Sequence, residues 1–360
     1  MKSNLGQNIS KSAFWERLSR ERLKKLLGKI VSELMSNLAT SVSVGGNILS
    51  QLGVTDIWIV DSSTITLQDG AKNNFPGTGA AAGIKWHACF SLMTGVMTWF
   101  HLTPSSTHDR KCMPDIKLLR GKLLISDLGY YDFGILLQIQ KVGGFFLSRL
   151  KSNAAVYVKE IVQGLSEKHV GQSLLSINFN KKTRAIVEVM IEKVHDHDTL
   201  VCRAVGFWNP SEQRYHWYVT NLKVMAILIY PLYRLRWQIE LIFKACKNSL
   251  NANQITSGDR NIIESLLLAS IAAHLGSHTL FEAAVNELDE CKTTAISFKR
   301  ISKVAVVLSR DFVRFLLNPS KHIESLMRKI KLFVNELFDP NYKNRETSLM
   351  RVHKLLGNST

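Results

Sequence analysis

The stretch that decides the fold of this chain is PLYRLRWQIELIFKACKNSL, residues 231–250. Proline is tolerated in the first turn of a helix, and neither glycine nor a second proline interrupts the residues after Pro231. The stretch therefore predicts one long helix that begins at Pro231. Five apolar residues fall on one side of this helix, which we expect to pack against a core: Leu235, Ile239, Ile242, Phe243 and Cys246.

A polar stripe runs along the same predicted helix, within an arc of roughly 60°. Its members are Tyr233, Arg236, Glu240 and Lys247, with Trp237 and Lys244 beside them. One interpretation is a solvated face, on which Arg236 and Glu240 form an i,i+4 ion pair that contributes about 0.2 to 0.5 kcal/mol. The alternative is a face that holds a metal-bound carboxylate and the phosphates around it, because a phenol, a guanidinium, a carboxylate and an ammonium group occur together.

The composition indicates a globular protein that binds a polyanion. With 360 residues, of which 46% are hydrophobic, the chain can bury a large core, either as one domain with an insertion or as several modules. The 46 Lys and Arg against 29 Asp and Glu give a net charge of +17, which favours nucleic acid as the partner. A generically basic protein and a binder of acidic membranes are the alternatives, but no lipidation signal supports the membrane.

The cysteines and the apolar runs predict a cytoplasmic protein without a membrane partner. The five cysteines are scattered and form no CxxC pair, as expected of reduced thiols. Residues 1–20 lack the apolar core of a signal peptide. The most apolar long run, residues 262–273, is too short to span a bilayer.

The first half of the chain predicts a mixed α/β structure. Residues 12–41 carry apolar positions at helical spacing, which predicts one or two amphipathic helices. A hairpin of two strands is then expected at residues 84–92 and 96–102, followed by a helix at 109–120 and a strand at 122–126. A second helix is expected at 131–141 and a further strand at 145–150.

Two acids in this half follow short apolar strands. The run Ile57–Val60 ends in Asp61, and the run Lys122–Ser126 ends in Asp127. Both acids are therefore expected at strand tips, and the two strands can be neighbours in one sheet.

The pattern changes after Lys151. Three runs of alternating polarity, RAIVEVMIE, TLVCRAVGFW and RYHWYVT, lie between residues 153 and 221, which predicts a β-rich module inserted before the Pro231 helix. The chain is helical again after Asn251, and residues 297–356 are basic and amphipathic.

Three carboxylates are suited to a hard metal ion. Asp61 and Asp127 end strands that can be neighbours, and Glu240 projects from a helix that can pack on their sheet. Such oxygen ligands suit Mg²⁺ or Mn²⁺, and Mg²⁺ keeps water molecules for exchange with phosphate. Two such ions about 3.5 to 4 Å apart activate a water or a 3′-hydroxyl and stabilise the leaving oxygen of a phosphodiester.

The spacing of these residues resembles a known family, the bacterial insertion-sequence transposases of the DDE class, in the cut-and-paste group (IS-four type) marked by Tyr-x2-Arg-x3-Glu-x6-Lys. Tyr233, Arg236, Glu240 and Lys247 stand at those spacings inside YRLRWQIELIFKACK. The acids stand in IVDSSTITL and LISDLGYYD, with GIKWH and THD between them. The resemblance covers about residues 50–280.

The resemblance implies a function and a role for individual residues. Asp61, Asp127 and Glu240 would be the catalytic triad that binds Mg²⁺ or Mn²⁺, and Tyr233, Arg236 and Lys247 would contact the DNA backbone at the transposon end. We also expect Lys244 and Trp217 to bind DNA. The implied activity is metal-dependent cleavage and strand transfer of terminal inverted repeats into target DNA, by a homodimer, in the bacterial cytoplasm beside the nucleoid.

The implied fold is α/β: an RNase H-like catalytic core interrupted by a β-rich insertion, with helical N- and C-terminal segments. The expected bounds are residues 1–50 for the N-terminal segment, 51–150 and 223–290 for the core, 151–222 for the insertion and 291–360 for the basic C-terminal region. Asp61 comes early compared with the family, which predicts a shortened copy or an internal start, with a shortened DNA-end-binding region.

Several alternatives stay open at this stage. The chain could be a remnant that only binds DNA, or a nuclease that hydrolyses DNA without strand transfer. Sheet packing is the simpler interpretation of Trp208 and Trp217, whereas stacking on an unpaired base, which contributes about 1 to 3 kcal/mol, is the functional one. Histidines and cysteines between the two acids match no closed zinc pattern, so we interpret them as partly buried structural residues: His87, Cys89, His101, His108 and Cys112.

Overall fold

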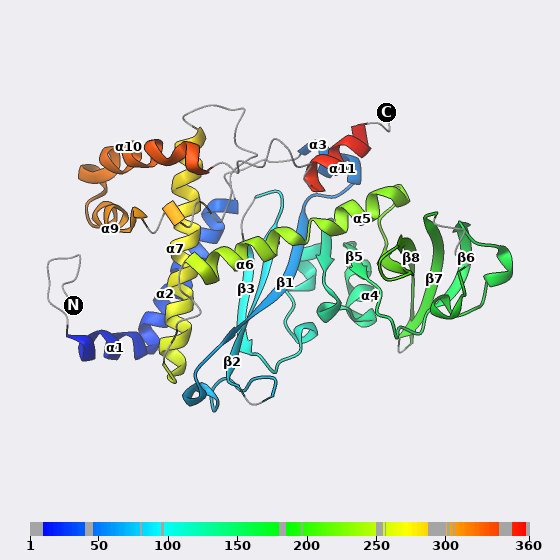
Figure 1. Ribbon diagram of the computed structural model, residues 1–360, viewed down its shortest axis with the longest axis horizontal. Helices are drawn as coiled ribbons and strands as arrows, with labels where there is room; N and C mark the ends of the chain where they lie inside the picture. The colour runs from blue at the N-terminus through cyan, green and yellow to red at the C-terminus, as the bar shows by residue number, and fades with distance from the viewer. Residues whose placement is uncertain are drawn as a thin grey trace.

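One nine-stranded sheet forms the centre of the protein (Figure 1). The computed structural model describes residues 10–39, 46–79, 81–94, 97–179, 185–195, 197–249, 255, 257–286, 300, 303–304, 307–337 and 348–357. The strands are β1 (Ile57–Thr66), β2 (Gly83–Ser91), β3 (Met97–Pro104), β4 (Leu123–Ser126), β5 (Phe145–Arg149), β6 (Tyr157–Gln163), β7 (Val187–His195), β8 (Asp198–Asn209) and β9 (Arg214–Thr220). Their order in the sheet is β3-β2-β1-β4-β5-β9-β8-β7-β6. The mixed α/β class predicted from the sequence is confirmed.

The first five strands form the half of the sheet that carries the two aspartates. β1, β2 and β3 are antiparallel, whereas β4 and β5 run parallel to β1. The prediction that β1 ends at Asp61 is wrong, because the residues after Asp61 pair with β2 as far as Thr66 opposite Gly83. The parallel pairing with β4 stops earlier, at Val60 opposite Ser126. Asp61 therefore lies inside a strand, and Asp127 directly follows one.

The strands of residues 151–222 extend the same sheet. β9 pairs antiparallel with β5, with Ser148 opposite Val219. β8, β7 and β6 follow as successive antiparallel neighbours, at the end of the molecule far from α7 (Arg260–Asn286) in Figure 1. The bounds of this segment as a separate module stay a prediction.

Helices cover the sheet and form a bundle beside it. Besides α7 they are α1 (Lys11–Ser19), α2 (Glu21–Ala39), α3 (Gly46–Leu52), α4 (Phe133–Lys141), α5 (Ala226–Arg234), α6 (Trp237–Ser249), α9 (Ser309–Leu317), α10 (Pro319–Leu337) and α11 (Ser348–Gly357). α7 contacts α1 and α2, and α9 contacts α10 (Figure 1). No helix in the described ranges is long and apolar enough to cross a membrane.

Short 3-10 turns connect several of these elements. They are η1 (Asp69–Ala71), η2 (Asp109–Lys111), η3 (Ile116–Leu119), η4 (Leu128–Tyr130), η5 (Glu167–His169) and η6 (Leu174–Ser176). The helix predicted at residues 109–120 is wrong, since η2 and η3 take its place. The reason is Pro114, which lacks an N–H for a helix and disfavours helical backbone at the residue before it.

The long helix predicted at residues 231–250 is two helices. α5 begins at Ala226, so Pro231 lies in its interior and not in its first turn. The helix tolerates this proline because Pro231 is buried together with Leu228 and Ile229. This tertiary packing outweighs the low helix propensity of proline. A turn at residues 235–236 then separates α5 from α6, where the N–H of Leu235 donates to the carbonyl of Leu232 at 3.0 Å, an i→i−3 bond in place of a helical one. Leu250 lies outside the described residues.

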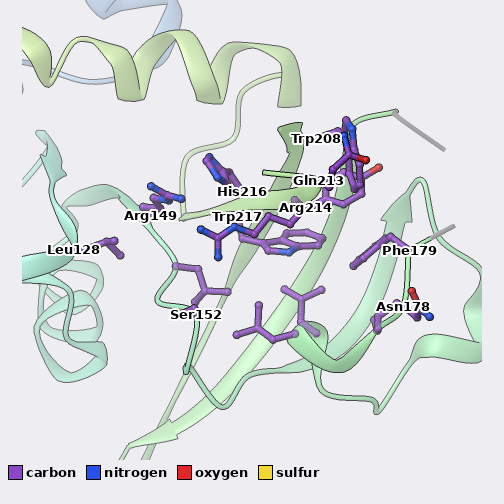
Figure 2. Close-up of a pocket in the computed structure, with 15 residues that line it drawn as sticks. Leu128, Arg149, Ser152, Asn178, Phe179, Trp208, Gln213, Arg214, His216 and Trp217 are labelled. Atoms are coloured by element: carbon purple, nitrogen blue, oxygen red, sulfur yellow. The ribbon is translucent and has the colours of Figure 1, made fainter. Parts of the chain in front are cut away.

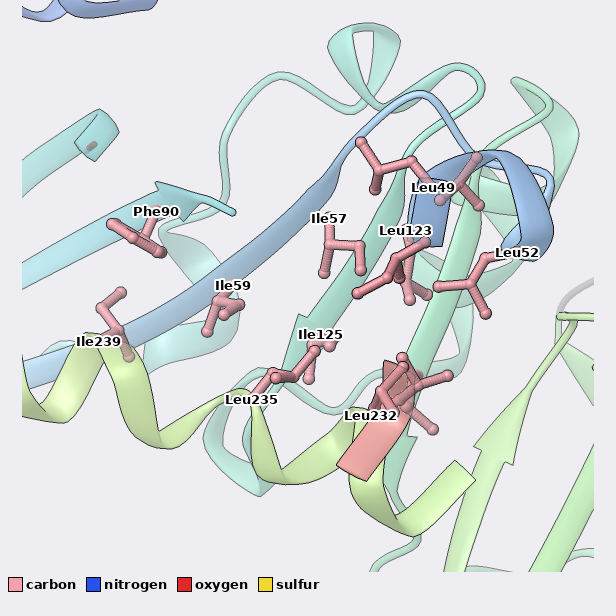
Figure 3. Packing of buried hydrophobic residues seen from close by; sticks show 14 of the residues in the cluster. Leu49, Leu52, Ile57, Ile59, Phe90, Leu123, Ile125, Leu232, Leu235 and Ile239 are labelled. Atoms are coloured by element: carbon pink, nitrogen blue, oxygen red, sulfur yellow. The ribbon is translucent and has the colours of Figure 1, made fainter. Parts of the chain in front are cut away.

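The apolar face predicted for this stretch packs on the sheet (Figure 3). Leu235, Ile239, Ile242 and Phe243 are buried as predicted, and the side chain of Cys246 lies outside the described set. Leu235 and Ile239 share one buried cluster with Ile59 of β1 and Ile125 of β4. The polar side of α6 is thereby held beside the two strands that precede or contain the acids.

Candidate active site

Three carboxylates from distant segments meet beside β1. Val60 pairs with Ser126, so the next residues of the two parallel strands, Asp61 and Asp127, lie side by side. Glu240 lies in the first turn of α6, which packs on β1. The structure thus brings together the acids that the sequence pattern singled out.

Arg236 connects two of these carboxylates. Its Nη1 lies 2.5 Å from Asp61 Oδ2, and its Nη2 lies 2.7 Å from Glu240 Oε1. The expected i,i+4 pair is therefore present, but on a covered face, since the side chains of Arg236 and Glu240 are only 18% and 25% exposed. The Nε of Arg236 is buried and has no hydrogen-bond partner within the described structure. The turn between α5 and α6 is what places this guanidinium between the two acids.

A cavity of about 410 Å³ opens over the carboxylates. Its wall consists of Asp61, Ser62, Ser63, Asp127, Arg236, Glu240, Phe243, Lys244 and Lys247. Six of the residues predicted to form the site therefore face one hollow: three acids and three cations.

The electrostatic environment of Asp61 favours an added cation. Its pKa is raised to about 6, chiefly by burial and also by the charges of Asp127 and Glu240, whereas Arg236 and the N–H of Ser62 act in the opposite direction. The Ser62 N–H donates to Asp61 Oδ1 at 2.8 Å. Positive charge near such a carboxylate stabilises its ionised form, which burial and like charges disfavour.

Tyr233 approaches the second acid from α5. Its hydroxyl lies 3.5 Å from Asp127 Oδ1, and its ring packs against Tyr218 with 4.9 Å between centroids. Burial, and then the charge of Asp127, raise the pKa of the Tyr233 phenol, so the group stays a hydrogen-bond donor.

The two lysines of α6 differ in their surroundings. Lys247 Nζ donates to the carbonyl of Thr64, which ties the helix to β1, and burial lowers the pKa of its ammonium group. Lys244 is exposed, and its Nζ lies 4.8 Å from the centroid of the Trp237 ring. Lys244 is therefore the more accessible cation at the cavity.

The three carboxylates supply the oxygen donors that hard divalent cations prefer. No three His, Cys, Asp or Glu side chains among the described residues are placed to hold a single ion. Asp61, however, interacts electrostatically with both Asp127 and Glu240, so the three acids repel one another and an added cation would relieve this repulsion.

Trp217 lines a second cavity, of about 600 Å³ (Figure 2). It is 5% exposed, and its ring lies 5.6 Å from that of Phe179 and 5.7 Å from that of Tyr215. Sheet packing therefore accounts for most of this side chain. The same cavity is lined by Arg149, Arg214 and His216, and by Leu128, the residue that follows Asp127.

Several residues near the acids had no predicted role in catalysis or DNA binding. Asp109 accepts hydrogen bonds from Ser62 Oγ at 3.0 Å and from Lys85 Nζ at 2.9 Å. His87 is fully buried, with its Nδ1 2.8 Å from the hydroxyl of Tyr130. The only sequence signal for these residues is the pair of motifs GIKWH and THD, which contain Lys85, His87 and Asp109.

The interpretation of five histidines and cysteines as partly buried structural residues is right for some and wrong for others. His87, Cys89 and Cys112 are buried. His101 and His108 are exposed, because β3 lies at the edge of the sheet and His108 lies in the segment that follows it.

Comparison with known proteins agrees with this geometry. The family model described as "Transposase DDE domain" matches residues 53–275. The chain belongs to this family. The matched range contains Asp61, Asp127 and Glu240 together with the Tyr233, Arg236 and Lys247 that surround them.

Among the curated relatives of this DDE-domain protein are transposases of insertion sequences. It is 26% identical to the transposase for insertion sequence element IS231F of Bacillus thuringiensis subsp. israelensis, covering 69% of this chain and 61% of the relative. It is 24% identical to that for IS1151 of Clostridium perfringens, covering 95% of this chain and 84% of the relative. This DDE-domain chain thus spans less than two thirds of the IS231F transposase.

A solved structure is also similar to this DDE-domain chain. It is the piggyBac transposase synaptic complex with hairpin DNA, with a TM-score of 0.42 and 10% identity over 86% of this chain and 59% of the other. A similarity of this size carries no conclusion about the fold.

Proposed function

We propose that this protein cleaves DNA at the ends of an insertion sequence and joins those ends to target DNA, with divalent metal ions held by Asp61, Asp127 and Glu240. The observation that carries the proposal is that these three side chains line one cavity although they lie far apart in the sequence. Membership of the DDE family and the names of the transposase relatives support it.

The strand order supports an RNase H-like core for this activity. β1, β2 and β3 form an antiparallel set, and β4 and β5 join it parallel to β1. In this proposal residues 51–150 and 223–290 form the core, residues 151–222 the insertion, and residues 1–50 and 291–360 the helical segments on either side.

The residues of the chain would divide the chemistry between them. Bound Mg²⁺ or Mn²⁺ would activate the attacking water or 3′-hydroxyl and stabilise the leaving oxygen. Asp61, Asp127 and Glu240 would hold these cations, since all three line the cavity. Burial of Asp61 keeps water away from these charges, which strengthens their attraction for a cation.

The cations around the cavity would hold the DNA backbone. Arg236 offers a planar fork that suits a phosphate, and Lys244 and Lys247 offer point charges. Tyr233 adds a hydroxyl donor on the side of Asp127. Arg236 and Lys247 are engaged within the protein, so a phosphate would exchange for their present partners, whereas Lys244 is exposed.

The second cavity would take an unpaired nucleotide beside the cut. The partly exposed Phe179 and Trp208 offer aromatic surface beside Trp217, and Arg149 and Arg214 offer charge for a phosphate (Figure 2). The cavity lies close to the second acid, because Leu128, the residue that follows Asp127, is part of its wall. The assignment of Trp217 to DNA binding rests on this surface.

The triad is tested by substitution of each acid. We expect Asp61→Asn, Asp127→Asn and Glu240→Gln to abolish Mg²⁺-dependent nicking of a plasmid that carries the DNA flanking the gene, while duplex affinity stays within about twofold, since each change removes a cation ligand and not a phosphate contact. Near wild-type cutting by any one variant removes that residue from the mechanism.

The same assay separates the rival functions. A remnant that only binds DNA would give no nicking in the wild type, and a hydrolytic nuclease would nick without joining ends to a target plasmid. We also propose that the protein binds DNA as a homodimer, which sedimentation of the DNA complex would test. A cytoplasmic location beside the nucleoid stays a prediction from the sequence.

A further inference from the structure

We propose that Asp109 is a positioning residue that fixes Asp61, in β1, and Asp127, directly after β4, relative to one another. The proposal rests on the function proposed above and adds a fourth acid to that site. Asp109 begins η2, in the segment between β3 and β4. Its side chain is 21% exposed and reaches both acid-bearing segments through different oxygens.

One oxygen of Asp109 holds the strand that carries Asp61. Asp109 Oδ1 accepts from Ser62 Oγ at 3.0 Å and from Lys85 Nζ at 2.9 Å. Ser62 also donates its N–H to Asp61 Oδ1 at 2.8 Å. Lys85 donates in addition to the carbonyl of Thr107 at 2.8 Å, which anchors the segment just before Asp109. Because Ser62 binds both carboxylates, the orientation of Asp61 depends on Asp109.

The other oxygen of Asp109 lies against the turn that carries Asp127. A Cβ added to Gly129 would lie 2.4 Å from Asp109 Oδ2, so the absence of a side chain is what lets this carboxylate approach η4. The next residue, Tyr130, is bound through its hydroxyl to His87 Nδ1 at 2.8 Å. That nitrogen lies 3.9 Å from Asp109 Oδ1. The part of β1 next to Asp61 and the turn that follows Asp127 are therefore fixed around one carboxylate.

The partners of Asp109 determine how it would act. Ser62 and Lys85 bind Oδ1, and the described wall of the cavity over the acids does not include Asp109. Asp109 would therefore act through its neighbours and not as a further cation ligand. Groups that orient metal ligands typically change metal affinity or activity by about 10- to 100-fold when they are removed. Loss of Asp109 should accordingly weaken cation binding without removing any ligand.

The test is Mn²⁺ binding by the full-length, DNA-free protein, measured from the electron paramagnetic resonance signal of free Mn²⁺. We expect Asp109→Ala to raise the Kd for Mn²⁺ about tenfold. Ser62→Ala and Asp109→Asn should raise it less, because the asparagine keeps an acceptor for Ser62. Asp115→Asn, an exposed acid of the same segment, is the matched control and should leave the Kd unchanged.

A second measurement distinguishes positioning from ligation. In plasmid nicking, excess Mn²⁺ should restore most of the activity of Asp109→Ala and Ser62→Ala but none of that of Asp61→Asn. Wild-type Mn²⁺ affinity in both Asp109→Ala and Ser62→Ala overturns the positioning role and leaves the proposed function standing. A wild-type protein that binds no Mn²⁺ and nicks no DNA overturns both. If Asp109→Ala does not fold, as judged by thermal unfolding, Ser62→Ala decides the question alone.

Discussion

Arg236 occupies carboxylate oxygens that the proposed cations need. It binds Asp61 Oδ2 and Glu240 Oε1, and Asp61 Oδ1 is already engaged by the Ser62 N–H. A cation that takes the place of the guanidinium at Asp61 Oδ2 displaces Arg236 from that oxygen. Arg236 thus serves two purposes in the proposed function: it balances the acids before a cation binds, and it becomes available to a phosphate afterwards.

This competition predicts opposite effects of one substitution on two measurements. In DNA-free protein, Arg236→Gln should tighten Mn²⁺ binding roughly 3- to 30-fold, about 0.7 to 2 kcal/mol, because the acids lose their competing cation. The same variant should cut DNA ends more slowly, since a phosphate donor is lost, and Arg236→Lys should recover only part of that rate. Arg234→Gln, an exposed arginine of α5, is the control. Unchanged Mn²⁺ affinity in Arg236→Gln would show that the guanidinium does not compete.

His87 makes the stability of the fold depend on pH. Burial lowers its pKa from 6.5 to about 4, against a smaller opposite effect of Asp109. Between these values the unfolded chain binds a proton that the folded chain does not, so stability is full above pH 6.5 and falls toward pH 4. At pH 5 we expect a loss of about 2 kcal/mol relative to pH 7, from about 1.4 kcal/mol per pH unit.

The contribution of His87 is isolated by a variant, because Asp61 acts in the opposite direction. The raised pKa of Asp61 means that the folded chain binds a proton at this carboxylate more readily than the unfolded chain does. The contribution of Asp61 to the stability of the fold therefore falls as pH rises from about 4 toward 6. Urea unfolding of wild type and His87→Gln at pH 5 and pH 7 gives the difference. His87→Gln should show the smaller loss at pH 5. Equal losses in the two proteins would contradict a neutral buried histidine.

At the scale of elements, the sequence predicted apolar faces better than element ends. Leu235 and Ile239 are buried as their helical spacing indicated, because each turn of an amphipathic helix places an apolar residue on the buried face. The break at residues 235–236 has no proline or glycine to mark it, and it depends on packing against β1 and β4. The end of β1 was misplaced for a similar reason, since strand pairing with β2 holds Asp61 inside the strand.

The sequence pattern did not predict contacts between residues that lie far apart in the chain. The spacing from Tyr233 to Lys247 identified the residues around Glu240, yet nothing in it indicated that Arg236 would reach Asp61. The contacts of Asp109 were equally unpredictable, because its partners Ser62 and Lys85 come from different strands. Such contacts follow from sheet order, which local periodicity does not encode.

The pairing of β8 with β9 requires a glycine at one position, which can be tested by substitution. Gly206 lies opposite Trp217, and an added Cβ would lie 2.8 Å from its ring. Gly206→Ala should therefore displace the ring and lower the free energy of unfolding by about 1 to 3 kcal/mol, as overpacking does. Denaturant unfolding and tryptophan fluorescence would measure both effects.

The matched control for this change is Gly276→Ala in α7. Apart from the adjacent residues and the nearby backbone of α7, no atom of the described residues lies within 4 Å of the added Cβ there. The helix should therefore gain about 0.5 to 1 kcal/mol from the loss of glycine freedom. If both alanines stabilise the protein, Trp217 has room to move, and the wall of the second cavity is less fixed than its contacts indicate.

At the scale of the whole molecule, the active site uses only a small part of the positive charge. The net charge is +17, whereas the cavity wall contains three cations against three acids. Most of the excess must therefore lie elsewhere. α10 contributes exposed basic residues, among them Lys321 and Arg328, on a helix that packs with α9 away from the sheet (Figure 1).

This excess predicts steep salt dependence of duplex binding. Each phosphate neutralised by Lys or Arg contributes a slope of about −0.9 in log K against log salt, because a counterion is released. If α10 lies on DNA, Lys321→Gln and Arg328→Gln should each reduce the slope by about 1 and weaken all duplexes alike. Glu324→Gln, an exposed acid of the same helix, should not reduce it. Fluorescence anisotropy over a salt series measures the slopes. A flat dependence in the wild type would mean that the positive charge does not contact DNA phosphates. Unchanged slopes in both α10 variants would place the phosphate contacts in other parts of the protein.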